Sequence, residues 1–334
     1  MLTNSRTDVM YFTGRQVHIK RDDLLHADFS GNKARKFYHF LINDFPGVSH
    51  IVGSGSAQAN SLYSLSVLAK IKGWKLDYYV SHIADYLKQQ LSLSSGIRSN
   101  YSQAIKNGAN VIEIDWSSNR YHACHHLDDA INVLKQDCLR KSNFQETLFI
   151  PEGGRCEYAK TGIYILGKEI VNWAISQGIN KLSIFLPSGT GTTALYLQEY
   201  FVTQAQKTTL DIQVLTCSTV GGDSYLISQF NELSSNSQLH PQIISDGNKY
   251  HFGKLYLSLF QLWQQVLDSS GIEFDLLYDP IGLNVLKHAI ESGELKDREI
   301  LYIHQGGLLG NATMLPRYLR KQALTKNDSV KINR

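Results

Sequence analysis

The sequence has little that would mark a disulfide-rich protein or a membrane protein. Its 334 residues contain four cysteines, none spaced as a CxxC pair: Cys124, Cys138, Cys156 and Cys217. This pattern excludes a disulfide framework and a zinc ribbon, and it suits a reducing compartment. No stretch approaches the roughly 18 apolar residues of a membrane span, and the N-terminus has no apolar run of signal-peptide length. We therefore expect a cytoplasmic protein that has no membrane segment.

An excess of one charge and a recognisable metal or hydrolase motif are also missing. The chain has 33 basic and 30 acidic residues, so its composition gives no basis for nucleic-acid binding. His122 and His126 would share a face of a helix predicted over residues 119–138, but no third ligand accompanies them, so we expect no metal site. The GxSxG elbow of many hydrolases does not occur.

What the sequence does contain is a regular alternation of strand-like and helix-like segments. With 43% hydrophobic residues the chain can bury a large core, and its length favours two lobes. Helices are predicted between the strands, and this alternation indicates a parallel α/β sheet. The predicted strands cover residues 17–20, 50–52, 76–80, 111–114, 148–150, 182–186, 212–216, 274–278 and 300–304. The polar tail after about residue 323 is expected to be frayed.

A lysine stands near the predicted start of a helix in the segment DFSGNKARK, residues 28–36. Ser30 and Asn32 are good helix-start residues, and Gly31 lets the chain bend sharply. The free N–H groups and the dipole of a helix N-terminus would favour the neutral amine of Lys33, which is the nucleophilic form. The alternative is that Lys33 belongs to a solvated basic helix face.

Glycine-containing turns follow the ends of several predicted strands, at residues 53–56, 153–154, 188–193 and 306–307. In an open α/β sheet, ligands collect outside the carboxyl ends of the strands, so these turns are expected to share one cleft. Residues 188–193 read SGTGTT, and their glycines, hydroxyls and following helix would form a phosphate cradle. An ordinary tight turn is the alternative for each of them.

Taken together, the ordered motifs resemble a known family. They are SGNKARK at 30–36, QAN at 58–60, PEGG at 151–154, SGTGTT at 188–193, Tyr278-Asp279 and HQGG at 304–307. The set is similar to the D-cysteine desulfhydrase / 1-aminocyclopropane-1-carboxylate (ACC) deaminase family of pyridoxal 5'-phosphate (PLP) enzymes. The resemblance implies the two-lobed parallel-sheet fold of the tryptophan-synthase-β-like (fold type II) enzymes. It places a small lobe at residues 46–150 and a large PLP-binding lobe at residues 1–45 and 151–334.

The resemblance also implies a role for individual residues. Lys33 and Tyr278 would be catalytic, with Lys33 holding PLP covalently and moving the substrate's α-proton. The residues that would bind the cofactor are Lys33, Lys36, Asn60, Ser188, Gly189, Thr190, Gly191, Thr192, Thr193, Asp279 and Gln305. Those that would bind the substrate are Gln58, Ala59, Asn60, Ser61, Tyr250 and Tyr278, with Tyr256 an alternative to Tyr250. A carboxylate at Asp279 would keep the pyridine nitrogen protonated.

The sequence departs from the family pattern around the substrate. Ala59 replaces the usual serine, Phe252 stands where a tyrosine often precedes glycine, and Gln305 replaces a threonine. The implied activity is D-cysteine desulfhydrase-like elimination on a small amino acid, in a homodimer, with ACC deamination as the alternative. An amino-acid racemase or dehydratase would use the same lysine. Proteins that bind PLP or a sugar phosphate without turnover are alternatives of another class.

Overall fold

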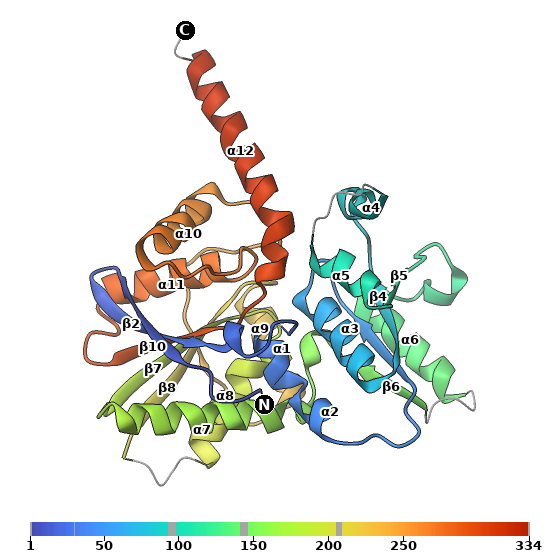
Figure 1. The fold of residues 1–334 in the computed structure, drawn as a ribbon, viewed down its shortest axis with the longest axis horizontal. Helices are drawn as coiled ribbons and strands as arrows, with labels where there is room; N and C mark the ends of the chain where they lie inside the picture. Colours follow the sequence, from blue (N-terminus) through green and yellow to red (C-terminus); the bar gives the residue numbers. More distant parts are fainter. Residues whose placement is uncertain (1, 30, 93–97, 141–145, 205–208, 333–334) are drawn as a thin grey trace.

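A computed structural model describes residues 2–29, 31–92, 98–140, 146–204 and 209–332, so Ser30 of the lysine motif lies outside the described residues. Figure 1 shows two lobes, each built around its own sheet. Within the described residues, the chain forms a six-stranded sheet and a four-stranded sheet. All four strands of the second sheet fall between residues 50 and 150, inside the segment predicted as the small lobe.

The large-lobe sheet has the strand order β1-β2-β10-β7-β8-β9. The strands are β1 (Thr7–Phe12), β2 (Arg15–Arg21), β7 (Lys181–Ser188), β8 (Asp211–Ser218), β9 (Gln242–Ile243) and β10 (Glu299–His304). Neighbouring strands run parallel except β1 and β2, which form an antiparallel pair. The strand β1 was not predicted.

The small-lobe sheet has the order β5-β4-β3-β6 and is parallel throughout. Its strands are β3 (His50–Ser54), β4 (Lys75–Val80), β5 (Asn110–Glu113) and β6 (Thr147–Ile150). Parallel strands in both sheets bring their carboxyl ends, and the loops that follow, to one edge of each sheet. The turns predicted to bind ligands therefore lie at such edges.

Helices cover both faces of the large sheet. Figure 1 shows α10 and α11 on one side and α7 and α8 on the other. The helices are α1 (Gly31–Lys36), α2 (Tyr38–Ile42), α3 (Asn60–Lys72), α4 (Asp85–Ser92), α5 (Asn100–Lys106), α6 (Leu127–Leu139), α7 (Lys160–Ser176), α8 (Thr192–Thr203), α9 (Asp223–Leu233), α10 (Leu257–Ser270), α11 (Asp279–Glu291) and α12 (Asn311–Ile332). Among the short 3₁₀ helices, η1 (Asp22–Leu24) and η4 (Glu152–Gly154) matter for the site.

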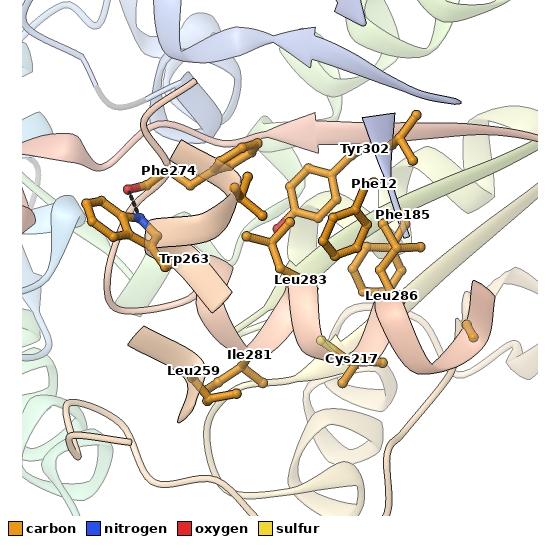
Figure 2. Close-up of a cluster of buried hydrophobic side chains, with 14 of the residues drawn as sticks. Phe12, Phe185, Cys217, Leu259, Trp263, Phe274, Ile281, Leu283, Leu286 and Tyr302 are labelled. Carbon is orange, nitrogen blue, oxygen red and sulfur yellow. Dashed lines mark hydrogen bonds between the residues drawn. The ribbon is translucent and has the colours of Figure 1, made fainter. Parts of the chain in front are cut away.

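Successive side chains of β7 pack alternately into the hydrophobic clusters on the two faces of the sheet. Phe185 faces the cluster that contains Tyr302 and the residues of α10 and α11, whereas Ile184 and Leu186 face α7 and α8. Figure 2 shows Phe185 close to Tyr302 and Leu286, and the indole nitrogen of Trp263 donates a hydrogen bond to the backbone carbonyl of Phe274 at 2.8 Å. The strand is thus buried on both faces, which explains its continuous apolar run.

Three local predictions are wrong. Residues 274–278 form an irregular loop instead of a strand, because Asp275 accepts hydrogen bonds from the backbone N–H groups of Leu277 and Tyr278 and turns the chain. His122 and His126 do not share a helix face, since His122 ends a 3₁₀ turn and His126 precedes α6. The described residues hold no cluster of potential metal ligands. The C-terminal tail continues as helix α12 as far as Ile332 instead of fraying at 323.

Helix α12 projects away from the body of the large lobe (Figure 1). Its first turns pack into the large-lobe core through Met314 and Tyr318. Neither α12 nor any other helix in the described part of the chain combines the length and the apolar character needed to cross a membrane.

Candidate active site

A single pocket collects residues from the turns that follow several strands. It encloses about 940 Å³ of empty space, part of which is open to solvent. Ser56, Gly153, Gly306 and the whole run from Ser188 to Thr193 line it. The prediction that the four glycine turns share one cleft is confirmed. Because these turns follow β3 and β6 of the small sheet and β7 and β10 of the large sheet, the pocket lies between the two lobes.

The lysine helix α1 is held in place by close packing on its N-terminal side. A Cβ on Gly31 would lie 2.5 Å from the backbone carbonyl of Asp22, so only glycine allows the helix to approach η1. Arg35, fully buried, donates to both Asp22 and Glu169 at 2.8 to 3.0 Å. This paired network fixes the helix by charge-assisted hydrogen bonds. Lys33 is therefore presented to the pocket from a rigid support.

Lys33 lines the pocket and is only 8% exposed. Burial lowers the pKa of its amine to about 8, while the nearby carboxylates of Glu152 and Asp275 oppose that shift. Lys33 is the third residue of α1, as predicted, but burial is the main reason for its low pKa. A buried lysine with this pKa carries a much larger fraction of neutral, nucleophilic amine near pH 7 than an exposed one.

Lys36, one turn further along α1, is also buried and lines the pocket. Its ammonium donates to the backbone carbonyl of Gly153 at 3.0 Å. Burial and the neighbouring Lys33 charge hold its pKa well below the usual range. Two buried lysines in one pocket repel each other, so an anionic ligand would relieve the repulsion between them.

The turn that starts α8 has the features of an anion cradle. Gly191 takes a positive φ of 67° and caps a 12-residue helix whose first amides are free of intrahelical partners. The buried hydroxyl of Thr193 has no hydrogen-bond partner among the described residues, although it sits in a pocket-lining turn. A buried polar atom without a partner is costly, and a phosphate group here would satisfy it. The turn therefore fits a phosphate better than it fits a mere connection.

A second helix N-terminus reaches the same pocket from the small lobe. Helix α3 begins at Asn60, and Ala59, Asn60 and Ser61 line the pocket. The side-chain carbonyl of Asn60 accepts a hydrogen bond from Asn100 at 2.9 Å. This bond fixes the orientation of the Asn60 amide and leaves its N–H groups to donate elsewhere. The start of α3 can thus receive a carboxylate, while Asn60 can donate to an oxygen of a ligand.

Two acidic residues, Glu152 and Asp275, line the pocket, and the predicted Asp279 does not. Asp279 accepts a hydrogen bond from the Tyr302 hydroxyl at 2.6 Å and from the backbone of Asp275 at 3.1 Å. Burial raises the pKa of Asp275 to about 7 and raises that of Asp279 well above its usual range. Asp275 is thus the aspartate that lines the pocket, while the role of Asp279 near the pyridine nitrogen stays a prediction.

The aromatic residues around the substrate end also differ from prediction. Tyr278 lines the pocket, and burial raises the pKa of its hydroxyl, so it stays protonated. Tyr250 lies outside the lining, because its hydroxyl is bonded to Asp246. The hydroxyl of Tyr256 accepts from the backbone of His251. Phe252 takes the position instead, with its ring centroid 5.5 Å from that of Tyr278.

Gln305 and Gln58 were both predicted to bind ligands. Gln305 lines the pocket, but its amide nitrogen donates to the carbonyl of Pro187 at 2.7 Å and its oxygen accepts from Asn32. It thus ties the last glycine turn to β7 and α1. Gln58 is not among the lining residues, and its side chain lies beside Tyr86.

Several lining residues were not assigned a role from the sequence. They are Asn32, Ser56, Glu152, Gly153, Pro187, Val220, Tyr225, Phe252, Asp275 and Gly306. Glu152 belongs to the PEGG motif at residues 151–154, so the sequence did contain a signal for it. Asp275 and Tyr225 had no such signal, because Asp275 lay in a segment predicted as a strand and Tyr225 in a region without regular periodicity. Burial raises the pKa of the Tyr225 hydroxyl to about 12, and the Glu152 carboxylate adds to the effect.

Comparisons with known proteins agree with this architecture. No protein-family model matches the chain. It is 22% identical over 303 residues, 89% of this chain and 90% of the other, to a Thermotoga maritima protein named as a candidate ACC deaminase. The crystal structure of an ACC deaminase homologue superposes with a TM-score of 0.72 at 20% identity, covering 96% of this chain and 95% of that one.

Two further solved structures share the fold at lower identity. A threonine deaminase from T.th. gives a TM-score of 0.60 at 12% identity and covers 92% of both chains. A hydrogen sulfide-producing enzyme of Fusobacterium nucleatum gives 0.58 at 11%, covering 92% of this chain and 97% of that one. The resemblance predicted from the motifs is thus confirmed, and the chain has the two-lobed, tryptophan-synthase-β-like α/β fold of the ACC deaminase homologue and of threonine deaminase.

Proposed function

We propose that the protein is a PLP-dependent lyase or deaminase that acts on a small amino acid. The observation that carries the proposal is Lys33, a buried lysine with a pKa of about 8 in a pocket between the lobes. The same pocket holds a phosphate cradle and a second helix N-terminus. Deaminases and a hydrogen sulfide-producing enzyme share the fold, which supports the same reaction class.

The residues of the pocket fit PLP. The unpartnered Thr193 hydroxyl and the start of α8 suit its phosphate, and Lys36 supplies a nearby cation. Lys33 has the neutral amine that a covalent bond to an aldehyde requires. The N–H groups of Asn60, oriented by Asn100, suit the ring oxygen. PLP bound in this way supplies an electron sink for the charge left at the substrate's α-carbon.

The surrounding residues would position the substrate and handle protons. The amides at the start of α3 would bind its carboxylate, as the residues Ala59 to Ser61 line the pocket there. Lys33 would accept the α-proton, since a low pKa lets it exchange protons near neutral pH. Tyr278 keeps its hydroxyl proton and would donate it to a departing group. Phe252 would exclude water beside it.

Within this class we propose D-cysteine desulfhydrase-like elimination ahead of ACC deamination. In the elimination, the Cα–H bond and the bond from Cβ to the leaving group break, and water then releases ammonia and an α-keto acid. The missing serine at position 59 and the phenylalanine at 252 take away two hydroxyls that ring opening of ACC would use. A thiolate departs without needing as much help, so elimination is favoured.

Two further proposals concern the setting of the enzyme. The four cysteines are unpaired, which suits a reducing cytoplasm. A homodimer is proposed from the resemblance alone. Sedimentation of the purified protein would test the second point, and a monomer at micromolar concentration would refute it.

The central experiment is a spectrum followed by product detection. Purified protein incubated with PLP should absorb visible light, and borohydride reduction should add the mass of reduced PLP to the peptide that carries Lys33. A colourless, unmodified protein would refute PLP binding. Release of keto acid is then measured with D- and L-cysteine, β-chloroalanine, ACC and threonine. No product from any of them would refute the lyase proposal while leaving PLP binding intact.

A further inference from the structure

The pocket contains one carboxylate that the proposed function does not use. Glu152 lies in η4, directly after strand β6, and its side chain lines the pocket. Its carboxylate makes no hydrogen bond or ion pair with any of the described residues. Asp275 differs, since its carboxylate accepts two backbone N–H groups at 2.6 Å. Glu152 is thus the pocket acid that is available to a ligand.

Close packing places the Glu152 carboxylate beside the turn that leads into α3. A Cβ on Gly55 would lie 3.0 Å from Oε1 of Glu152 and 2.6 Å from the Tyr78 hydroxyl. Gly55 has a φ of 142° and leads into the turn that starts α3. The absence of a side chain at this position leaves room for the carboxylate beside the start of α3. The next residue, Gly153, borders the phosphate cradle, since a Cβ on it would lie 2.7 Å from the Thr190 hydroxyl oxygen.

The charges around Glu152 leave its negative charge without a dedicated partner. Burial raises the pKa of Glu152, Asp128 adds to the effect, and Arg155 and Lys33 oppose it. Arg155 is already paired with Asp128 at 3.5 Å and with Glu232 at 3.2 Å. Lys33 would offer no free ammonium while it holds PLP, and it would be released as a neutral amine before it accepts the α-proton. A cation supplied by the substrate would therefore meet a half-buried carboxylate that has no hydrogen-bond or ion-pair partner among the described residues.

We propose that Glu152 binds a second amino group on the substrate's side chain, so that the enzyme prefers small diamino acids such as 2,3-diaminopropionate. This inference rests on the proposed function and specifies its substrate class. Three aromatic residues, Tyr225, Phe252 and Tyr278, line the pocket and take up room in it. A short side chain is therefore favoured, with the second amino group on Cβ or Cγ.

The reaction with 2,3-diaminopropionate balances without any further reactant except water. The Cα–H bond breaks and its proton passes to the Lys33 amine. The Cβ–N bond breaks, and its electron pair leaves with the side-chain nitrogen as ammonia. Water hydrolyses the resulting enamine to pyruvate and a second ammonia. Glu152 keeps its charge throughout and serves only to bind the ammonium group before it departs.

The test compares two substrates with the same carbon skeleton on the PLP-loaded enzyme. Pyruvate release is measured for 2,3-diaminopropionate and for β-chloroalanine, each as both enantiomers, with wild type and Glu152→Gln. The substitution keeps the shape and removes the charge, so the ratio of kcat/KM for the diamino acid to that for β-chloroalanine should fall about 30-fold, the size of one charge-assisted hydrogen bond. The matched control is Glu157→Gln, whose side chain is 86% exposed, and it should leave the ratio unchanged.

Two outcomes would overturn the inference. One is a wild-type enzyme that turns over β-chloroalanine but neither binds nor turns over the diamino acid. The other is a Glu152→Gln variant that lowers both kcat/KM values by the same factor. A protein that fails to acquire the visible absorbance of bound PLP would instead refute the proposed function, so the two failures are distinguishable.

Discussion

At the end of the pocket proposed to hold a phosphate, backbone amides and threonine hydroxyls at the start of α8 form a cradle that follows β7, a strand buried on both faces. At the substrate end, the start of α3 is surrounded by side chains that differ from the family pattern, Ala59 and Phe252 among them. The cradle is built mainly from backbone, so it depends on glycine and local geometry. The substrate end is built from side chains, which single substitutions can change. Substitutions can therefore change the substrate specificity of such a pocket without removing its cofactor site.

The largest effect is expected from replacing Lys33, which is proposed both to hold PLP and to accept the substrate's α-proton. Lys33→Ala should abolish the covalent link to PLP and lower turnover at least about 10³-fold, because both the anchor and the proton acceptor are lost. Absorbance spectra and keto-acid release measure the two effects. Lys168→Ala on the exposed face of α7 is the matched control. A Lys33→Ala protein that retains a borohydride-stable adduct would contradict the assignment.

The pH dependence of PLP capture should show that Lys33 is not an ordinary lysine. Only the neutral amine reacts, and a pKa lowered to about 8 means that the rate rises up to about pH 8 and then levels off. Below that point, each pH unit should cost roughly a factor of ten. Stopped-flow absorbance on PLP-free protein measures the rate. A rate that keeps rising to pH 10 would indicate an unperturbed amine instead.

Restoring the family hydroxyl should change the substrate end alone. Ala59→Ser places a hydroxyl in the pocket at the position before Asn60. Keto-acid release should rise about fivefold, the value of one hydrogen bond of ~1 kcal/mol, while the PLP absorbance stays unchanged. The control is Ala57→Ser, which lies in the same turn but outside the pocket lining. Equal changes in both variants would mean that the turn, not the hydroxyl, matters.

An effect of the same size is expected in the cradle proposed to bind the phosphate. Thr193→Val removes a hydroxyl that has no partner among the described residues, so the PLP-free protein should keep its Tm while PLP affinity falls about fivefold. Thr216→Val removes a buried hydroxyl that is bonded to Leu186 and Ser188 and should lower the Tm. Calorimetry and PLP titration measure both quantities. A loss of Tm without loss of affinity in Thr193→Val would contradict the cradle.

Most of the fold followed from local patterns. The apolar runs of β3, β7 and β10 and the glycine turns after them were recognisable, because parallel buried strands need continuous apolar residues and abrupt turns. The loop at 274–278 was mistaken for a strand. Its apolar residues face a core, as a strand's would, but the Asp275 side chain competes for the backbone N–H groups.

The sequence predicted the pocket residues that belong to recognisable motifs. It did not predict those that reach the pocket only through tertiary packing. Lys33, Lys36, Asn60 and the cradle all line the pocket. Tyr250 and Phe252 are close in sequence, and their local pattern does not indicate which of them lines the pocket. The hydrogen bond from the Tyr250 hydroxyl to Asp246 holds that side chain outside the pocket lining. The orientation of Asn60 likewise depends on Asn100, which belongs to a different helix.

By itself, the sequence determined the strand–helix alternation, the lysine at the start of a short helix and the cradle before α8. Each of these depends on residues close together in the chain, where backbone geometry and helix ends act locally. The tertiary structure decided the pKa of Lys33, the placement of Asp275 and not Asp279 in the pocket lining, and the unpaired carboxylate of Glu152. These depend on burial and on charges from distant segments, which become neighbours only when the two lobes pack together.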